Sequence, residues 1–109
     1  MALATMQCDV RQLQAMLNQS PGPCLIDVRE KWELDICTLP NALHIPLGLL
    51  PQQLADLPKE KDIVLFCHHG MRSLKALSIL QAAGYSRAIS LQGGIHAWAE
   101  QIDPGMKKY

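Results

Sequence analysis

The stretch that decides the fold reads Ile63-Val64-Leu65-Phe66-Cys67-His68-His69-Gly70-Met71-Arg72-Ser73. Its first four residues are apolar without alternation, which predicts a strand covered on both faces, as in the centre of a parallel sheet. A helix is predicted over 73–83, and Gly84 is expected to end it. Leucines repeat every third residue along one face of that helix: Leu74, Leu77 and Leu80. The stretch therefore predicts a strand, a loop that carries a cysteine and an arginine, and a helix.

The rest of the chain alternates short apolar runs with helix-like segments. Further strands are predicted at 24–28, 43–45 and 88–91, and helices at 10–18, 52–57 and 95–101, with one or two helical turns within 29–35. Such alternation is typical of an α/β domain in three layers, with a mainly parallel central sheet and helices on both faces. We expect a single domain over residues 1–109, without internal repeats or linkers.

Composition excludes several classes of partner. Ten Lys and Arg residues balance ten Asp and Glu residues in a chain of 109, so no nucleic-acid partner is indicated. The apolar runs are far too short to span a membrane, and the first seven residues lack the basic region and apolar core of a secretory signal. We therefore expect a cytoplasmic protein. Charge is unevenly distributed, because 64–99 contains no Asp or Glu but holds Arg72, Lys75 and Arg87.

The four cysteines fit no paired metal-binding spacing, and in a reducing compartment we expect free thiols. Cys8 is expected at the surface or at a helix edge, and Cys24 in the core. Cys37 precedes a loop and is expected to be exposed. For Cys37, a resolving or sulfur-accepting role and an incidental thiol both stay open, with the incidental thiol favoured.

Cys67 is the candidate nucleophile. It follows the predicted central strand, and ligand sites in open α/β sheets lie just beyond the carboxyl ends of strands. The loop then enters a helix, so backbone N–H groups can converge on one point, bind an anion and lower the thiol pKa from about 8.5. Arg72 adds positive charge, and Gly70 permits a positive φ. A buried, inert thiol is the alternative for a lone cysteine, but this combination favours a nucleophile.

Other polar residues have less certain roles. His68 and His69 are candidates for general bases, metal ligands or bystanders. Because adjacent residues do not easily chelate one ion, and His44 and His96 are isolated in the sequence, we expect no metal site. We expect both loop histidines to shape the rim and to tune charge near neutral pH.

Asp27 and Arg29 flank the end of the predicted strand at 24–28. They are interpreted as a charged pair that supports the active loop, with a solvated strand end as the alternative. Trp32 and Trp98 are expected to pack in the core or at the rim.

Four segments together resemble the rhodanese family of single-domain sulfurtransferases, over nearly the whole chain. They read Ile26-Asp27-Val28-Arg29-Glu30 with Trp32-Glu33, then 40–47 (Pro-Asn-Ala-Leu-His-Ile-Pro-Leu), then 64–73 around Cys67, and finally 91–98 (Leu-Gln-Gly-Gly-Ile-His-Ala-Trp). The resemblance implies a rhodanese-like α/β domain whose anion-binding loop comprises His68, His69, Gly70, Met71, Arg72 and Ser73. The ending 102–109 also resembles the tail of rhodanese domains fused to adenylating enzymes.

The resemblance further implies an activity. Cys67 would take a sulfane sulfur from a small anionic donor such as thiosulfate, and a thiol, cyanide or protein acceptor would remove it, without a metal or organic cofactor. Two alternatives give different expectations. A protein-docked relay module would turn over small molecules slowly. A cysteine phosphatase or arsenate reductase needs five residues between cysteine and arginine, whereas Cys67 and Arg72 are separated by four, so we expect no phosphate-ester hydrolysis.

Overall fold

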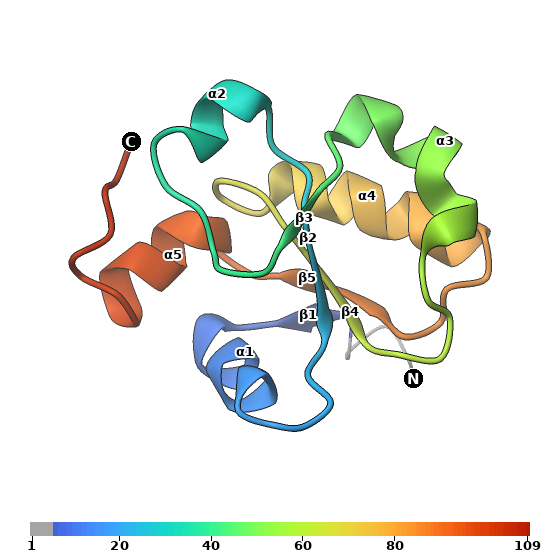
Figure 1. Cartoon of the computed structure of the whole chain (residues 1–109), viewed down its shortest axis with the longest axis horizontal. Helices are drawn as coiled ribbons and strands as arrows, with labels where there is room; N and C mark the ends of the chain where they lie inside the picture. The colour runs from blue at the N-terminus through green and yellow to red at the C-terminus, as the bar shows by residue number, and fades with distance from the viewer. Residues whose placement is uncertain (1–5) are drawn as a thin grey trace.

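The computed structural model describes residues 6–109. Five parallel strands form a sheet in the order β1-β5-β4-β2-β3, so β4 lies at its centre (Figure 1). The strands are β1 Gln7–Cys8, β2 Cys24–Asp27, β3 Leu43–His44, β4 Ile63–Phe66 and β5 Ala88–Leu91. The predicted parallel sheet is confirmed, and two of its strands, β4 and β5, have the predicted bounds.

Helices cover both faces of the sheet. They are α1 Val10–Leu17, α2 Lys31–Leu34, α3 Leu50–Gln53, α4 Met71–Ala82 and α5 Gly94–Gln101, with 3₁₀ turns at Leu47–Leu49 and Leu54–Asp56. Figure 1 shows α1 and α5 on one side of the sheet and α3 and α4 on the other. Among the described residues, none of these helices has the length and apolar character needed to cross a bilayer.

The central strand separates two hydrophobic clusters. Ile63 and Leu65 pack with Leu50, Leu77 and other residues from the α3 and α4 side. Alternate residues point the other way, so Val64 and Phe66 join the cluster that includes α1 and α5 side chains. The unbroken apolar run of β4 is thus explained by burial on both faces.

Several details differ from the sequence predictions. The helix predicted at 52–57 is instead α3 Leu50–Gln53 followed by a 3₁₀ turn at Leu54–Asp56. Cys8 is 5% exposed in β1, a two-residue strand that was not predicted, and it is buried rather than superficial. Leu74 is 39% exposed whereas Leu77 and Leu80 are buried, because a spacing of three drifts around a helix with 3.6 residues per turn. The helix α4 begins at Met71, two residues before the predicted start.

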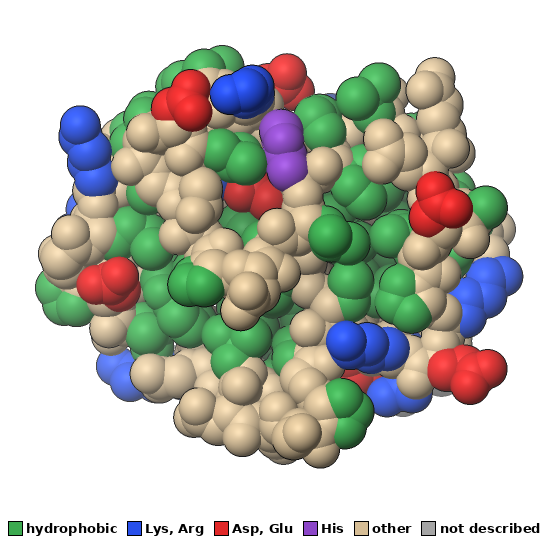
Figure 2. Space-filling model, in the orientation of Figure 1, with side chains coloured by type: hydrophobic (Ala, Val, Ile, Leu, Met, Phe, Trp, Pro, Cys, Tyr) green, Lys and Arg blue, Asp and Glu red, His purple; other side chains and the backbone are tan. Residues whose placement is uncertain are grey.

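The surface has no large area of one charge on the face shown in Figure 2. Lys, Arg, Asp and Glu side chains lie mainly around its periphery with both signs interspersed, and hydrophobic and uncharged groups occupy the middle. This distribution agrees with the balanced composition.

Candidate active site

The candidate site is built around the sulfur of Cys67, which directly follows β4. The loop after it folds back so that the Gly70 N–H donates to Cys67 Sγ at 3.1 Å and the Ser73 N–H donates at 3.4 Å. Cys67 is 1% exposed. Two backbone donors directed at one enclosed sulfur stabilise negative charge on it.

Gly70 and Ser73 give the loop its shape. Gly70 has φ +112° at the start of α4, a conformation that favours glycine, as predicted. The Ser73 hydroxyl donates to the Gly70 carbonyl at 3.1 Å and lies 3.7 Å from Cys67 Sγ. It also pairs with the Ser90 hydroxyl at 2.7 Å, so β5 supports the base of the loop.

The start of α5 holds the other side of the loop. The Ile95 N–H donates to the Cys67 carbonyl at 2.9 Å, and the His96 N–H donates to the His68 carbonyl at 3.0 Å. This close approach requires Gly94, where a Cβ atom would lie 2.5 Å from the Cys67 carbonyl oxygen. Gly94, the first residue of α5, therefore has a direct structural reason at the candidate site.

Arg72 does not donate to the sulfur among the described hydrogen bonds. Its guanidinium instead binds Glu33 in a bidentate pair, with N···O distances of 2.6 and 2.7 Å. The hydrogen bonds that Arg72 donates to Glu33 are the largest cause that raises the pKa of Arg72, and the charge of Cys67 contributes in the same direction. Arg72 thus adds a more distant positive field, while the backbone makes the direct contacts with sulfur.

Asp27 and Arg29 form a buried ion pair at the end of β2. Arg29 Nη2 and Asp27 Oδ2 are 2.8 Å apart, and Arg29 is 0% exposed. The guanidinium also donates to the Cys37 carbonyl at 2.8 Å and to the Tyr109 hydroxyl at 2.8 Å. The alternative of a solvated strand end is wrong, and the pair connects β2 with two distant segments of chain.

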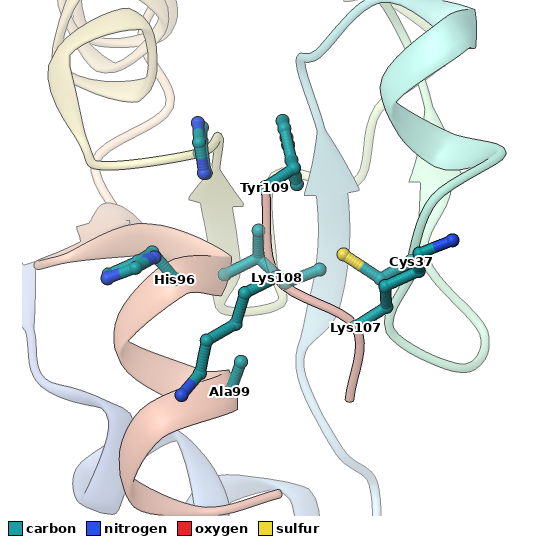
Figure 3. Close-up of a pocket in the computed structure, with 8 residues that line it drawn as sticks. Cys37, His96, Ala99, Lys107, Lys108 and Tyr109 are labelled. Atoms are coloured by element: carbon teal, nitrogen blue, oxygen red, sulfur yellow. The ribbon is translucent and has the colours of Figure 1, made fainter. Parts of the chain in front are cut away.

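The C-terminal segment lies over this network. Figure 3 shows Lys107, Lys108 and Tyr109 passing between α5, which carries His96, and the segment that carries Cys37. The Tyr109 hydroxyl donates to Glu33 Oε1 at 2.8 Å, and its ring stacks on His68 with centroids 3.7 Å apart. Burial, the largest cause, raises the pKa of Tyr109 to about 12.

The histidines are arranged differently from the sequence interpretation. His68 is partly buried and His69 is exposed, which fits the predicted rim. His96 is not isolated, because its ring centroid lies 4.8 Å from that of His69 and 5.8 Å from that of His68. Burial is the largest cause that lowers the pKa of His68, and the neighbouring His69 acts in the same direction.

Comparison with known proteins decides the family. A model of the Rhodanese-like domain family matches residues 9–101. The chain belongs to the rhodanese-like domain family.

Two curated relatives illustrate the range of proteins similar to this rhodanese-like domain. It is 43% identical over 101 residues to "Probable adenylyltransferase/sulfurtransferase MoeZ" of Mycobacterium tuberculosis, covering 91% of this chain but 26% of that protein. It is 36% identical over 93 residues to a "Sulfurtransferase" of Allochromatium vinosum, covering 85% of this chain and 87% of that one. The chain thus spans about a quarter of MoeZ and most of the shorter relative.

Solved structures show the same fold. The human single-domain sulfurtransferase TSTD1 has a TM-score of 0.81 and 28% identity, covering 88% of this chain and 96% of the other. A rhodanese-like domain protein from Staphylococcus aureus also has a TM-score of 0.81, with 30% identity and coverage of 94% and 97%. Together the family match and these likenesses support cysteine-based sulfur transfer as the chemistry of the domain.

Cys24 and Cys37 take no part in the hydrogen bonds to the Cys67 sulfur among the described residues. Cys24 begins β2 and packs at the edge of the core, so it is half-buried rather than central. Cys37 is also half-buried, and its sulfur lies 4.0 Å from Arg29 Nη1. The choice between a relay thiol and an incidental one stays open for Cys37.

Glu33 and Tyr109 are the site residues that the sequence interpretation missed. Glu33 lies in one of the family-like segments without a predicted role, although it is 2% exposed and binds Arg72. An acidic residue within a short amphipathic turn beside Trp32 was the available signal. Tyr109 carried no signal, because its partners lie 76 and 80 residues away. Trp32 is 61% exposed at the rim beside Tyr109, and Trp98 is buried in the core.

We expect the folded domain to lose stability in acid as the Glu33 carboxylate is protonated. The Arg72 hydrogen bonds are the largest cause that lowers the Glu33 pKa from its usual 4.5 to about 2; burial opposes them and the Glu30 N–H assists. A lowered carboxyl pKa contributes stability that is fully present above pH 4.5 and is lost as pH falls through about 2, by about 3 kcal/mol in total.

We expect Glu33→Gln to remove this part of the pH dependence. Urea denaturation at pH 7, 5 and 3 measures the free energy of unfolding of both proteins. The difference in stability between the native chain and the variant should shrink as the pH falls. A constant difference from pH 7 to pH 3 would show that the ion pair with Arg72 does not lower the Glu33 pKa.

Proposed function

We propose that this rhodanese-like domain transfers a sulfane sulfur from thiosulfate, or a similar small anion, to a thiophilic acceptor through a persulfide on Cys67. The observation that carries the proposal is the pair of N–H groups, from Gly70 and Ser73, that donate to one enclosed sulfur. That geometry supports a thiolate nucleophile after β4. The similarity to named sulfurtransferases supports sulfur as the transferred atom.

The reaction has two displacements. The Cys67 thiolate attacks the outer sulfur of thiosulfate, a new S–S bond forms, the original S–S bond breaks, and sulfite leaves with its electron pair. The acceptor then attacks the terminal sulfur of the persulfide, and Cys67 leaves as a thiolate. A covalent intermediate between two substrates predicts ping-pong kinetics.

The charges suit this sequence of steps. Thiosulfate, the persulfide and sulfite are all anions, and the same two N–H groups can stabilise negative charge throughout without a general base. Arg72 adds positive charge that is partly balanced by Glu33. We assign Arg72 the positioning of the loop, and Asp27 with Arg29 the support of the segment beside it.

The direct test is to locate the transferred sulfur. Thiosulfate-treated protein should gain the mass of one sulfur atom, and peptide mapping should place it on Cys67. Cyanide should remove it and yield thiocyanate. A Cys37→Ser variant serves as the matched thiol control and should gain the same mass. Protein that gains no sulfur, or gains it on another cysteine, would contradict the proposal.

A protein acceptor is the second candidate, favoured by the relatives that combine two activities. MoeZ and the uba4 proteins carry adenylyltransferase and sulfurtransferase in one name, and this chain matches about a quarter of their length. A relay module would form the persulfide but release it slowly to cyanide or dithiothreitol. Fast release to both small acceptors would favour the thiosulfate sulfurtransferase. For either activity we propose a reducing compartment such as the cytoplasm, where thiols stay free.

A further inference from the structure

Three imidazole side chains meet beside the loop that follows β4. His68 and His69 belong to that loop, and His96 lies in the first turn of α5. One ring nitrogen from each lies within 4.8 Å of the other two, so the adjacent residues His68 and His69 converge on one point, unlike the expectation from their sequence positions. The hydrogen bond from the His96 N–H to the His68 carbonyl holds the two segments together, so the cluster is fixed by backbone contacts.

Two nitrogens in this cluster lack a partner within residues 6–109. His68 Nε2 and His96 Nδ1 are buried and make no hydrogen bond among the described residues. Buried polar atoms are nearly always paired, so each unpaired one requires an explanation. Two such atoms on neighbouring rings, both of a type that binds metals, point to one shared ligand.

The surroundings already orient two of the rings. His96 Nε2 lies 3.4 Å from Glu100 Oε2, one helical turn further along α5. A carboxylate on the far nitrogen of a histidine is the usual outer partner of a metal ligand, because it fixes the tautomer and leaves the near nitrogen free. The His68 ring is held flat against Tyr109, with an interplanar angle of 5°.

We propose that His68, His69 and His96 bind one divalent transition metal, of the zinc class, with Glu100 as the residue that positions His96. Imidazole nitrogen suits zinc, copper and nickel, whereas magnesium and calcium prefer oxygen ligands. Three protein ligands leave a fourth position for water or a small anion, as in open zinc sites.

The spacing needs only side-chain adjustment. Zn–N distances of about 2.0–2.1 Å place tetrahedral ligand nitrogens roughly 3.3 Å apart, somewhat closer than the 4.8 Å limit of this cluster. His69 is exposed and can rotate toward the other two rings. Figure 3 shows His96 on α5, where it lines a pocket together with Cys37 and Tyr109.

The test is a metal titration that does not depend on turnover. Untagged protein, with no added polyhistidine, is titrated with Zn²⁺ by calorimetry at neutral pH, and a single site is expected. His96→Ala should weaken binding by at least about 100-fold, and Glu100→Gln by about 10- to 100-fold. His44→Asn is the matched control, because His44 bonds to the Arg29 carbonyl and is not one of the three clustered histidines. This variant should bind Zn²⁺ like the native chain.

Cobalt distinguishes the ligand types. Co²⁺ bound by imidazoles should give visible bands without the strong near-ultraviolet band of a thiolate ligand, and Cys67→Ser should leave that spectrum unchanged. Circular dichroism confirms that each variant is folded. Native-like Zn²⁺ affinity in His96→Ala, or a cobalt spectrum dominated by sulfur, would overturn the proposal. Neither result bears on sulfur transfer, since neither measurement uses it.

Discussion

Replacing Cys67 with serine is expected to reduce sulfur transfer from thiosulfate to cyanide by at least about a thousandfold. A serine hydroxyl is not ionised at neutral pH and cannot form the S–S bond of a persulfide. Because the two residues have nearly the same shape, the contacts from Gly70 and Ser73 are expected to remain. The loss should therefore appear in turnover without a loss of folded protein.

The matched control is Cys24→Ser. Cys24 lies at the start of β2, at the opposite end of the parallel strands from Cys67, and its variant should keep the native rate. Thiocyanate production measures both variants, and circular dichroism verifies their folding. If Cys67→Ser retained a substantial fraction of the native rate while Cys24→Ser lost it, the nucleophile would have been assigned to the wrong cysteine.

The sequence predicts the central part of this fold because its signals are local. An unbroken apolar run indicates a strand buried on both faces, and β4 begins and ends where that run does. Gly70 predicts the turn into α4 because the positive φ of that turn depends on this one residue and not on distant contacts. The strand, the loop and the helix after it could thus be placed from neighbouring residues alone.

The parts that were missed depend on contacts between distant residues. The strand β1 has two residues, and its pairing of Gln7 with Ser90 is what defines it. No periodicity can show so short an element. The sequence also gives no reason to join Glu33 with Arg72, 39 positions later, or to bring His96 to the loop histidines. These pairings follow from the parallel sheet, which carries the carboxyl ends of its strands to one edge.

Arg29→Met is expected to destabilise the fold by about 3–5 kcal/mol, because it leaves the buried Asp27 carboxylate without its cation. That is a large share of the roughly 5–15 kcal/mol that holds a domain of this kind together. Asp27 is 1% exposed, so water cannot replace the lost partner. The Cys37 carbonyl would lose a donor as well.

Two further variants separate burial from charge pairing in this experiment. Arg87→Met breaks an ion pair with Asp62 whose side chains are half-exposed, and it should cost at most about 1 kcal/mol. The double variant Asp27→Leu with Arg29→Met removes both charges, and it should be more stable than Arg29→Met alone, since no unpaired charge stays buried. Urea denaturation at neutral pH gives all three values.

Equal costs for Arg29→Met and Arg87→Met would show that the buried pair adds no more than a surface pair. The end of β2 would then hold its place through the Val28 N–H bond to the Phe66 carbonyl and the packing around it, and Asp27 with Arg29 would have no supporting role beside the Cys67 loop.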